Sequence, residues 1–125
     1  MFQAENNTET MQVTKSLALS ESKQGGLICI RGNFIGQLIP LPCDKKVILG
    51  RDAGLCTYVI TDSHVSRKHC EITYVATLDK YRVIDYSKNG TFLGNGQRLN
   101  REQEYYLSAK EELYLGSEDN LYKLR

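Results

Sequence analysis

Residues 69–86 read HCEITYVATLDKYRVIDY, and the order of residue types in this stretch predicts β-strands. Apolar side chains occupy every second position of its first half: Cys70, Ile72, Tyr74 and Ala76. Glu71 and Thr73 lie between them. Successive side chains of a strand point to opposite faces, so this period of two residues predicts a half-buried strand. The segment 81–86 is similarly rich in β-branched and aromatic residues.

Short runs of the same kind continue from Leu27 to the end of the sequence. They are mostly three to eight residues long, too short for ordinary helices, and are separated by Gly, Asn and Asp. In the sequence GNG at 94–96, Asn95-Gly96 matches a two-residue type I′ hairpin turn, which needs positive φ at both positions. We therefore expect an all-β fold, an antiparallel β-sandwich of about 11 short strands.

The composition of the chain changes near Gly25-Gly26. Residues 1–24 are polar and carry scattered apolar residues without a sustained period, which predicts a flexible N-terminal tail. Residues 25–125 are expected to form one domain, because a chain of 125 residues has room for a single core.

Composition and charge restrict the function. Apolar residues at 41% and charged residues at 25% are typical of a soluble globular protein. The 16 basic and 15 acidic residues nearly cancel, so we expect no binding of nucleic acid or membrane through a global field, and only local recognition of anions. The chain has neither a signal-like N-terminus nor an apolar stretch near the roughly 18 residues of a membrane span, which favours a cytoplasmic location.

The cysteines do not form a metal-binding pattern. Cys29, Cys43, Cys56 and Cys70 lie more than ten residues apart, whereas zinc ligands usually come in close pairs. A disulfide would suit a secreted chain. We expect small buried thiols, no metal and no cofactor.

Residues 61–71, TDSHVSRKHCE, concentrate serines, histidines and basic residues. Ser66 with His69, or the adjacent Ser63 and His64, could belong to a serine hydrolase, with Asp62 or Asp85 as the orienting acid. However, the chain has no G-x-S-x-G motif, and one small sandwich offers little with which to build a closed cleft. We therefore expect no enzyme.

Two other interpretations apply to this segment. A metal site is disfavoured because His64 and His69, five residues apart, would lie on opposite faces of a strand. If the segment stood alone, its Ser, Asp and His side chains would most simply cap a loop.

Two further motifs flank this segment. The sequence VILGRD, with Gly50-Arg51 at the end of a strand, precedes it, and DYSKNGTF at 85–92 follows it. The ordered series Gly-Arg, Ser-Arg-Lys-His and Ser-Lys-Asn-Gly-Thr resembles the forkhead-associated (FHA) domain, a phosphothreonine-peptide-binding module. The resemblance covers roughly residues 27–124. It implies an FHA-type sandwich with a binding site in the loops at one end.

The resemblance assigns roles to individual residues. It implies that Arg51, Ser66 and Arg67 bind the phosphate, for which a guanidinium fork and a hydroxyl donor are suited. It implies that Asn89, with its amide donors and acceptor, reads the peptide backbone. Lys88 stands at a variable position of the family and would add a screened positive charge.

Three residues are expected to support the site rather than to touch the peptide. By resemblance His69 braces the loop, while Gly50 and Gly90 serve backbone geometry. The role of His64 stays open. The expected partner is a phosphothreonine-containing protein, a Ser/Thr kinase or its substrate, and the chain is expected to be a monomer. The alternative is a structural or oligomerising sandwich that does not depend on phosphorylation.

The N-terminal tail contains three candidate phosphorylation sites. Each has an apolar residue three positions later, a position by which family members commonly select their peptides: Thr8, Thr10 and Thr14, followed by Met11, Val13 and Leu17. Some bacterial relatives fold a phosphorylated tail onto their own site. We therefore hypothesise that the phosphorylated tail inhibits its own site, with Thr10 or Thr8 as the first candidate and Thr14 as the third.

Overall fold

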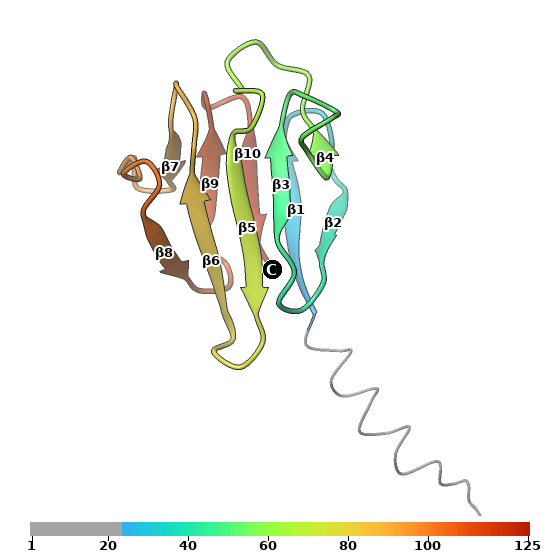
Figure 1. Ribbon diagram of the computed structural model, residues 1–125, viewed down its shortest axis with the longest axis vertical. Helices are drawn as coiled ribbons and strands as arrows, with labels where there is room; N and C mark the ends of the chain where they lie inside the picture. The colour runs from blue at the N-terminus through green and yellow to red at the C-terminus, as the bar shows by residue number, and fades with distance from the viewer. Residues whose placement is uncertain (1–23) are drawn as a thin grey trace, which may run out of the picture.

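The computed structural model describes residues 24–125, which form ten β-strands and, within this range, no helix that could cross a membrane (Figure 1). The predicted tail and its three threonines therefore lie outside the described residues, apart from Gln24. The strands, in chain order, are β1 (Gly25–Arg31), β2 (Leu38–Leu41), β3 (Val47–Gly50), β4 (Tyr58–Val59), β5 (Cys70–Val75), β6 (Lys80–Asp85), β7 (Thr91–Leu93), β8 (Glu104–Leu107), β9 (Glu112–Leu115) and β10 (Leu121–Leu124).

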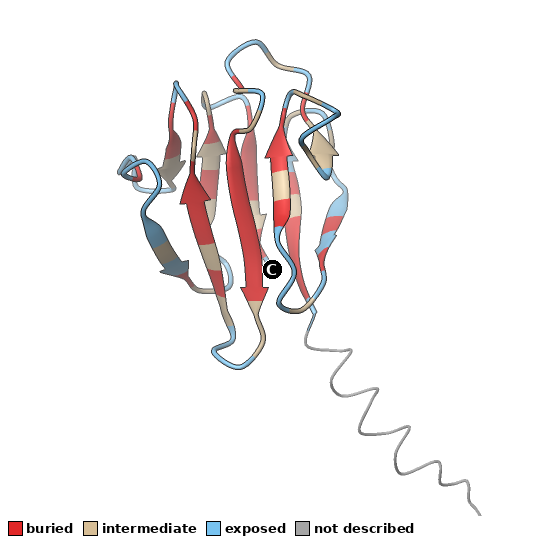
Figure 2. Cartoon of the chain, viewed as in Figure 1, coloured by how far each residue is buried: buried red, intermediate tan, exposed pale blue. Residues whose placement is uncertain are grey.

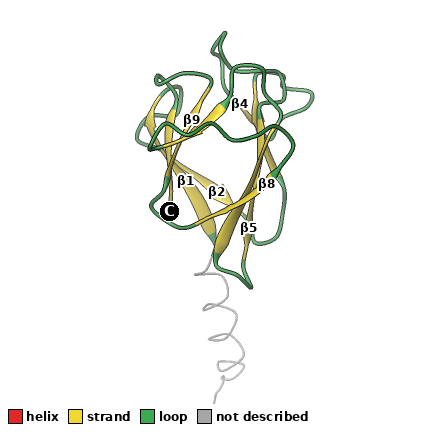
Figure 3. Cartoon of the chain, turned by 90° about the vertical axis from the view of Figure 1, so that its left-hand side faces the viewer, coloured by secondary structure: helices red, strands yellow, loops and turns green. Residues whose placement is uncertain are grey.

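The strands form two five-stranded sheets. One has the order β2-β1-β10-β9-β7 and the other β4-β3-β5-β6-β8. Seen from the side, the two sheets lie face to face with loops gathered at both ends (Figure 3). The predicted all-β sandwich is confirmed, with ten strands in the described part of the chain. One pair differs from the antiparallel prediction, since β4 pairs in parallel with β3 after the chain loops back through residues 51–57.

The core lies between the sheets, and β5 is buried along most of its length (Figure 2). Its apolar residues face inward as predicted. Its other face is also covered: Glu71 and Thr73 are only 5% and 3% exposed. Arg82 on the neighbouring strand β6 explains this burial, because its Nη2 lies 4.0 Å from Glu71 Oε2 and donates to Thr73 Oγ1 at 3.4 Å. The strand is therefore more fully buried than its alternating pattern indicated.

The cysteines are all free thiols. Cys29 and Cys70 are buried as predicted, whereas Cys43 and Cys56 are half-buried. Burial raises the pKa of the Cys29 thiol above its ordinary value.

The turn after β7 is not the predicted type I′ turn. Only Gly96 has a positive φ there, at 93°. Leu93 O accepts from Gly96 N–H at 2.8 Å, and Leu93 N–H donates to Gln97 O at 2.8 Å. These bonds enclose a three-residue loop whose last residue is a glycine in the left-handed region. Such loops are the next most common hairpin connection after two-residue turns. The segment that follows pairs briefly with β7: Arg98 lies opposite Phe92, and Leu99 N–H donates to Thr91 O at 2.9 Å.

Three loops meet at one end of the sandwich, at the top of Figure 1. They are residues 51–57 after β3, residues 60–69 before β5, and residues 86–90 after β6. All three predicted motifs therefore come to the same end of the molecule.

Candidate functional site

Arg51 is the first residue after β3, and the neighbouring loop fixes its backbone and side chain. Its N–H donates to Ser66 O at 2.9 Å, and its Nε donates to Val65 O at 2.9 Å. The side chain is exposed, and its two terminal nitrogens form no hydrogen bond within the described residues. The guanidinium therefore presents a fork of donors whose orientation is set before any ligand arrives.

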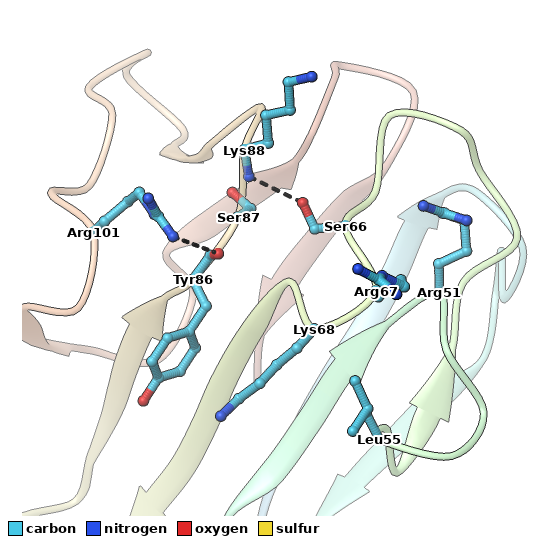
Figure 4. Close-up of a pocket in the computed structure, with 9 residues that line it drawn as sticks. All are labelled: Arg51, Leu55, Ser66, Arg67, Lys68, Tyr86, Ser87, Lys88 and Arg101. Carbon is cyan, nitrogen blue, oxygen red and sulfur yellow. Dashed lines mark hydrogen bonds between the residues drawn. The ribbon is translucent and has the colours of Figure 1, made fainter.

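Ser66 connects two loops through both its backbone and its side chain. Its hydroxyl oxygen accepts from Lys88 N–H at 3.0 Å, as the dashed line in Figure 4 shows. Its own N–H donates to His69 Nδ1 at 3.0 Å. Because a hydroxyl has one proton and two lone pairs, the Ser66 proton stays available for another acceptor.

His69 is fully buried beneath these loops, and its hydrogen bonds define its tautomer. Nδ1 accepts from Ser66 N–H, so the ring proton resides on Nε2, which donates to Gly90 O at 2.9 Å. Burial lowers the pKa of His69 below its ordinary value, which keeps the ring neutral. The imidazole thus joins the loop before β5 to the loop after β6.

These contacts differ from those of a serine hydrolase. A catalytic histidine would accept the serine hydroxyl proton and donate to a carboxylate. Here His69 is bonded to two backbone groups. The carboxylate of Asp85 instead accepts from the hydroxyls of Ser87 and Thr91, at 2.6 and 2.7 Å. Asp85 holds the turn that starts the next loop.

Gly50 and Gly90 stand where a side chain would collide or strain the backbone. A Cβ on Gly50 would overlap the carbonyl oxygen of Arg67 and approach Cys56 Sγ to 2.7 Å. The close approach lets Asp52 N–H donate to Arg67 O at 3.2 Å. Gly90 has a φ of +104°, the left-handed region that favours glycine.

The loops enclose an open pocket of about 550 Å³ (Figure 4). Its lining residues are Arg51, Leu55, Ser66, Arg67, Lys68, Tyr86, Ser87, Lys88 and Arg101. Four of the five residues predicted to contact the ligand are among them. The fifth, Asn89, is outside the lining, and its Nδ2 donates to His64 O at 2.9 Å.

The sequence interpretation missed Leu55, Lys68, Tyr86, Ser87 and Arg101 as lining residues. Three of them, Lys68, Tyr86 and Ser87, lie within the recognised motifs, so the sequence already indicated that they would be close to the pocket. Leu55 follows the Gly-Arg motif within the same loop. Arg101 had no such signal, because a bridge to Asp85 brings it to the pocket from a distant part of the chain.

His64 forms a separate contact beside the pocket. Its N–H and Nδ1 lie 2.8 and 3.1 Å from Asp62 Oδ1, and Asp62 Oδ2 accepts from Asn120 Nδ2 at 3.0 Å. The hydrogen bond from the His64 backbone is the main cause that lowers the pKa of Asp62. These bonds tie the loop before β5 to the loop that precedes β10.

Comparison with known proteins identifies the family. The sequence model of the FHA domain matches residues 47–116, which include all three loops of the pocket. The chain belongs to the FHA domain family. FHA domains are non-catalytic binding modules.

Relatives and solved structures agree with this assignment. The meiosis-specific serine/threonine-protein kinase MEK1 of Saccharomyces cerevisiae is 36% identical over 90 residues, which cover 67% of this chain and 18% of the kinase. The chain spans less than a fifth of the length of the curated relatives it matches.

The FHA domain of the CT664 protein from Chlamydia trachomatis superposes with a TM-score of 0.70 at 28% identity, covering 81% of this chain and 95% of that chain. The N-terminal FHA domain of S. cerevisiae Rad53p, solved with a phosphothreonine peptide, has a TM-score of 0.63 at 26% identity, covering 81% and 90%.

Proposed function

We propose that this FHA domain binds phosphothreonine peptides through the pocket at the end of its sandwich. The observation that carries the proposal is the arrangement of Arg51 and Ser66, whose ligand-facing donors are oriented by hydrogen bonds to neighbouring loops. A phosphate ester has nearly two negative charges and three acceptor oxygens. Arg51 supplies a bidentate fork, Ser66 supplies a hydroxyl proton, and Arg67 adds a second charge. The similar domain of Rad53p was solved with such a peptide.

Lys88 and Asn89 are proposed to contact the peptide around the phosphoresidue. Asn89 gives one amide hydrogen to His64 O, so its second amide hydrogen and its Oδ1 remain for a peptide backbone. The ammonium group of Lys88 points away from Ser66 (Figure 4), and Lys88 therefore adds charge at the rim of the pocket.

A paired titration tests the proposal. One threonine peptide is measured with and without its phosphate by calorimetry. Binding of the phosphorylated form alone supports the proposal. Equal binding of both forms, or binding of neither, would favour the alternative of a structural or oligomerising sandwich. The similarity to MEK1 suggests a Ser/Thr kinase or its substrate as the source of the peptide.

We further propose that the phosphorylated N-terminal segment occupies the chain's own pocket. Thr8, Thr10 and Thr14 precede the domain, with Thr10 or Thr8 as the preferred site. β1 begins at the end of the sandwich opposite the pocket, so the segment must run along the sandwich to reach its own site (Figure 1). Leu27 follows Thr10 by 17 positions, and a fully extended chain of that length reaches about 56–61 Å, more than the length of a domain with a radius of gyration of about 13 Å. Tethering by a short linker gives an effective concentration of up to about 1 mM, well above a micromolar Kd, so the tail would occupy the site.

Comparison of the phosphorylated and unmodified chain by NMR tests this switch. Self-closure should shift the resonances of Arg51, Ser66 and Asn89 and weaken binding of an external phosphopeptide. Unchanged resonances together with equal external binding would exclude the switch while leaving the phosphopeptide site intact.

A further inference from the structure

The pocket carries more positive charge than one phosphate needs. Five of its lining residues are cationic: Arg51, Arg67, Lys68, Lys88 and Arg101. No Asp or Glu lines it. Among residues 24–125, salt bridges within 4.0 Å involve only His64 and Arg82, so none of the five pocket cations is paired there with a carboxylate. A phosphate dianion matched by two arginines would leave a surplus of charge.

The cations are divided between two sides of the pocket (Figure 4). Arg51 and Arg67 lie together beside Ser66. Arg101 lies across the pocket, beyond Ser87, and Lys68 extends toward the ring of Tyr86, away from both Ser66 and Arg101. One phosphate bound at Ser66 would therefore engage the first pair and leave the second pair facing the rest of the peptide.

The second pair is positioned by the end of β6. Arg101 forms a backbone bridge with Asp85, and its Nη2 donates to Tyr86 O at 3.4 Å. The Lys68 ammonium lies 4.1 Å from the centre of the Tyr86 ring, within the range of a cation–π contact. Both side chains thus have defined places around one residue, and neither contact consumes the positive charge.

We propose that Lys68 and Arg101 form a second anion subsite with two separate contacts, one at each end of Tyr86, which recognises negatively charged side chains near the phosphothreonine of the same peptide. This inference rests on the proposed phosphopeptide function and adds a preference to it. Two chemistries meet the requirement: the carboxylate of Asp or Glu, and a second phosphate. Arginine and lysine bind both groups, and a dianionic phosphate gains more from either cation than a carboxylate does.

Three series of peptides test the subsite by calorimetry. The first peptide carries one phosphothreonine and otherwise uncharged residues. The second series adds a single Asp at each of three positions on either side, and the third places phosphoserine at the same positions. The variants are the wild type, Lys68→Gln/Arg101→Gln, and the control Lys45→Gln/Lys46→Gln, which removes two exposed charges between β2 and β3 at the opposite end of the sandwich.

The wild type should bind at least one doubly anionic peptide about twofold to fivefold more tightly than the singly charged peptide, the gain typical of exposed ion pairs. Lys68→Gln/Arg101→Gln should lose this gain, so that it binds the singly charged and the doubly anionic peptides with equal affinity. The control variant should retain the gain. A larger gain with phosphoserine than with Asp would identify a second phosphate as the ligand.

Two results would overturn the inference. One is a wild type that binds the singly charged phosphopeptide but gains nothing from any added anion. The other is an equal gain in the wild type, the double variant and the control variant, which would show that the gain comes from the net charge of the peptide and not from Lys68 and Arg101. If no phosphopeptide binds the wild type, the proposed phosphopeptide function fails, and the inferred subsite fails with that function. If a single-stranded oligonucleotide displaced the phosphopeptide and bound with equal affinity, the surplus positive charge would instead serve to bind nucleic acid.

Discussion

At the scale of single residues, Arg51 differs from Arg67 and Lys88 in how its side chain is held. Arg67 and Lys88 present exposed side chains, whereas the Nε of Arg51 is bonded to Val65 O. A pre-oriented guanidinium loses less conformational freedom on binding than a free side chain does. The affinity for phosphate should therefore depend most on this residue.

Replacing Arg51 with Ala should abolish measurable phosphopeptide binding and leave the fold intact. Removing a charged, hydrogen-bonded partner costs about 2–5 kcal/mol, and a micromolar complex amounts to only about 8 kcal/mol. Arg51→Lys keeps the charge but not the fork of donors, so its affinity should lie between that of the wild type and that of Arg51→Ala. Calorimetry measures binding and thermal unfolding measures the fold. An Ala variant that binds like the wild type would place the phosphate elsewhere.

The buried His69 should make stability depend on pH in mildly acid solution. Burial lowers its pKa in the folded state, so below the unfolded value of about 6.5 the unfolded chain takes up a proton that the folded chain does not. The free energy of unfolding should thus be highest above about pH 6.5. It should decrease, by at most about 1.4 kcal/mol per pH unit, as the pH falls toward the folded-state pKa.

Urea unfolding at pH 7.5 and pH 5.5 measures this dependence. His69→Gln should be less stable overall but should lose the dependence, whereas His64→Gln, which removes the other histidine, should keep it. A wild type with the same stability at both pH values would show that His69 takes up a proton in the folded state as readily as in the unfolded chain.

At the scale of elements, the site depends on how closely the loop before β5 passes over the end of β3. Gly50→Ala should displace this loop, because the new Cβ would meet backbone at Arg67 rather than a flexible side chain. Such overpacking costs roughly 1–3 kcal/mol. Gly54→Ala in the adjacent loop is a matched control, since its nearest contact is 3.2 Å from an oxygen of the Asp52 side chain.

Urea unfolding should show the loss of stability for Gly50→Ala and little change for Gly54→Ala. Phosphopeptide affinity should fall in the first variant even under conditions where it is folded, because Ser66 and Arg67 move with the loop. Wild-type affinity in a folded Gly50→Ala protein would show that the pocket tolerates this displacement.

The sequence predicted the elements whose determinants are local. The strand at β5 and its inward-facing apolar residues follow from a local alternation and agree with the structure, whereas the burial of its second face depends on Arg82 of the neighbouring strand. The parallel pairing of β3 with β4 and the position of Arg101 depend on contacts between distant segments, which one sequence does not display. The Asn95-Gly96 pair fits two hairpin types, and only the register of the flanking segments selects between them.

At the scale of the whole molecule, the pocket couples ligand binding to the stability of the sandwich. Apart from Arg101, which lies between β7 and β8, its residues come from the loops after β3, before β5 and after β6. The last of these loops leads to β7 in the opposite sheet. A peptide that contacts all three loops binds only when they are assembled. Binding to the folded state alone stabilises it by mass action.

A phosphothreonine peptide should therefore raise the unfolding temperature, whereas its unphosphorylated counterpart should not. At a free concentration of 100 times Kd the gain is about 2.7 kcal/mol, which corresponds to a shift on the order of 10 °C for a domain of this size. Differential scanning fluorimetry over a peptide series measures it. The Arg51→Ala variant is the control. If the peptide shifted that variant as much as the wild type, the stabilisation would arise from contacts outside the pocket, because a ligand held by the Arg51 fork has no comparable affinity once the fork is gone.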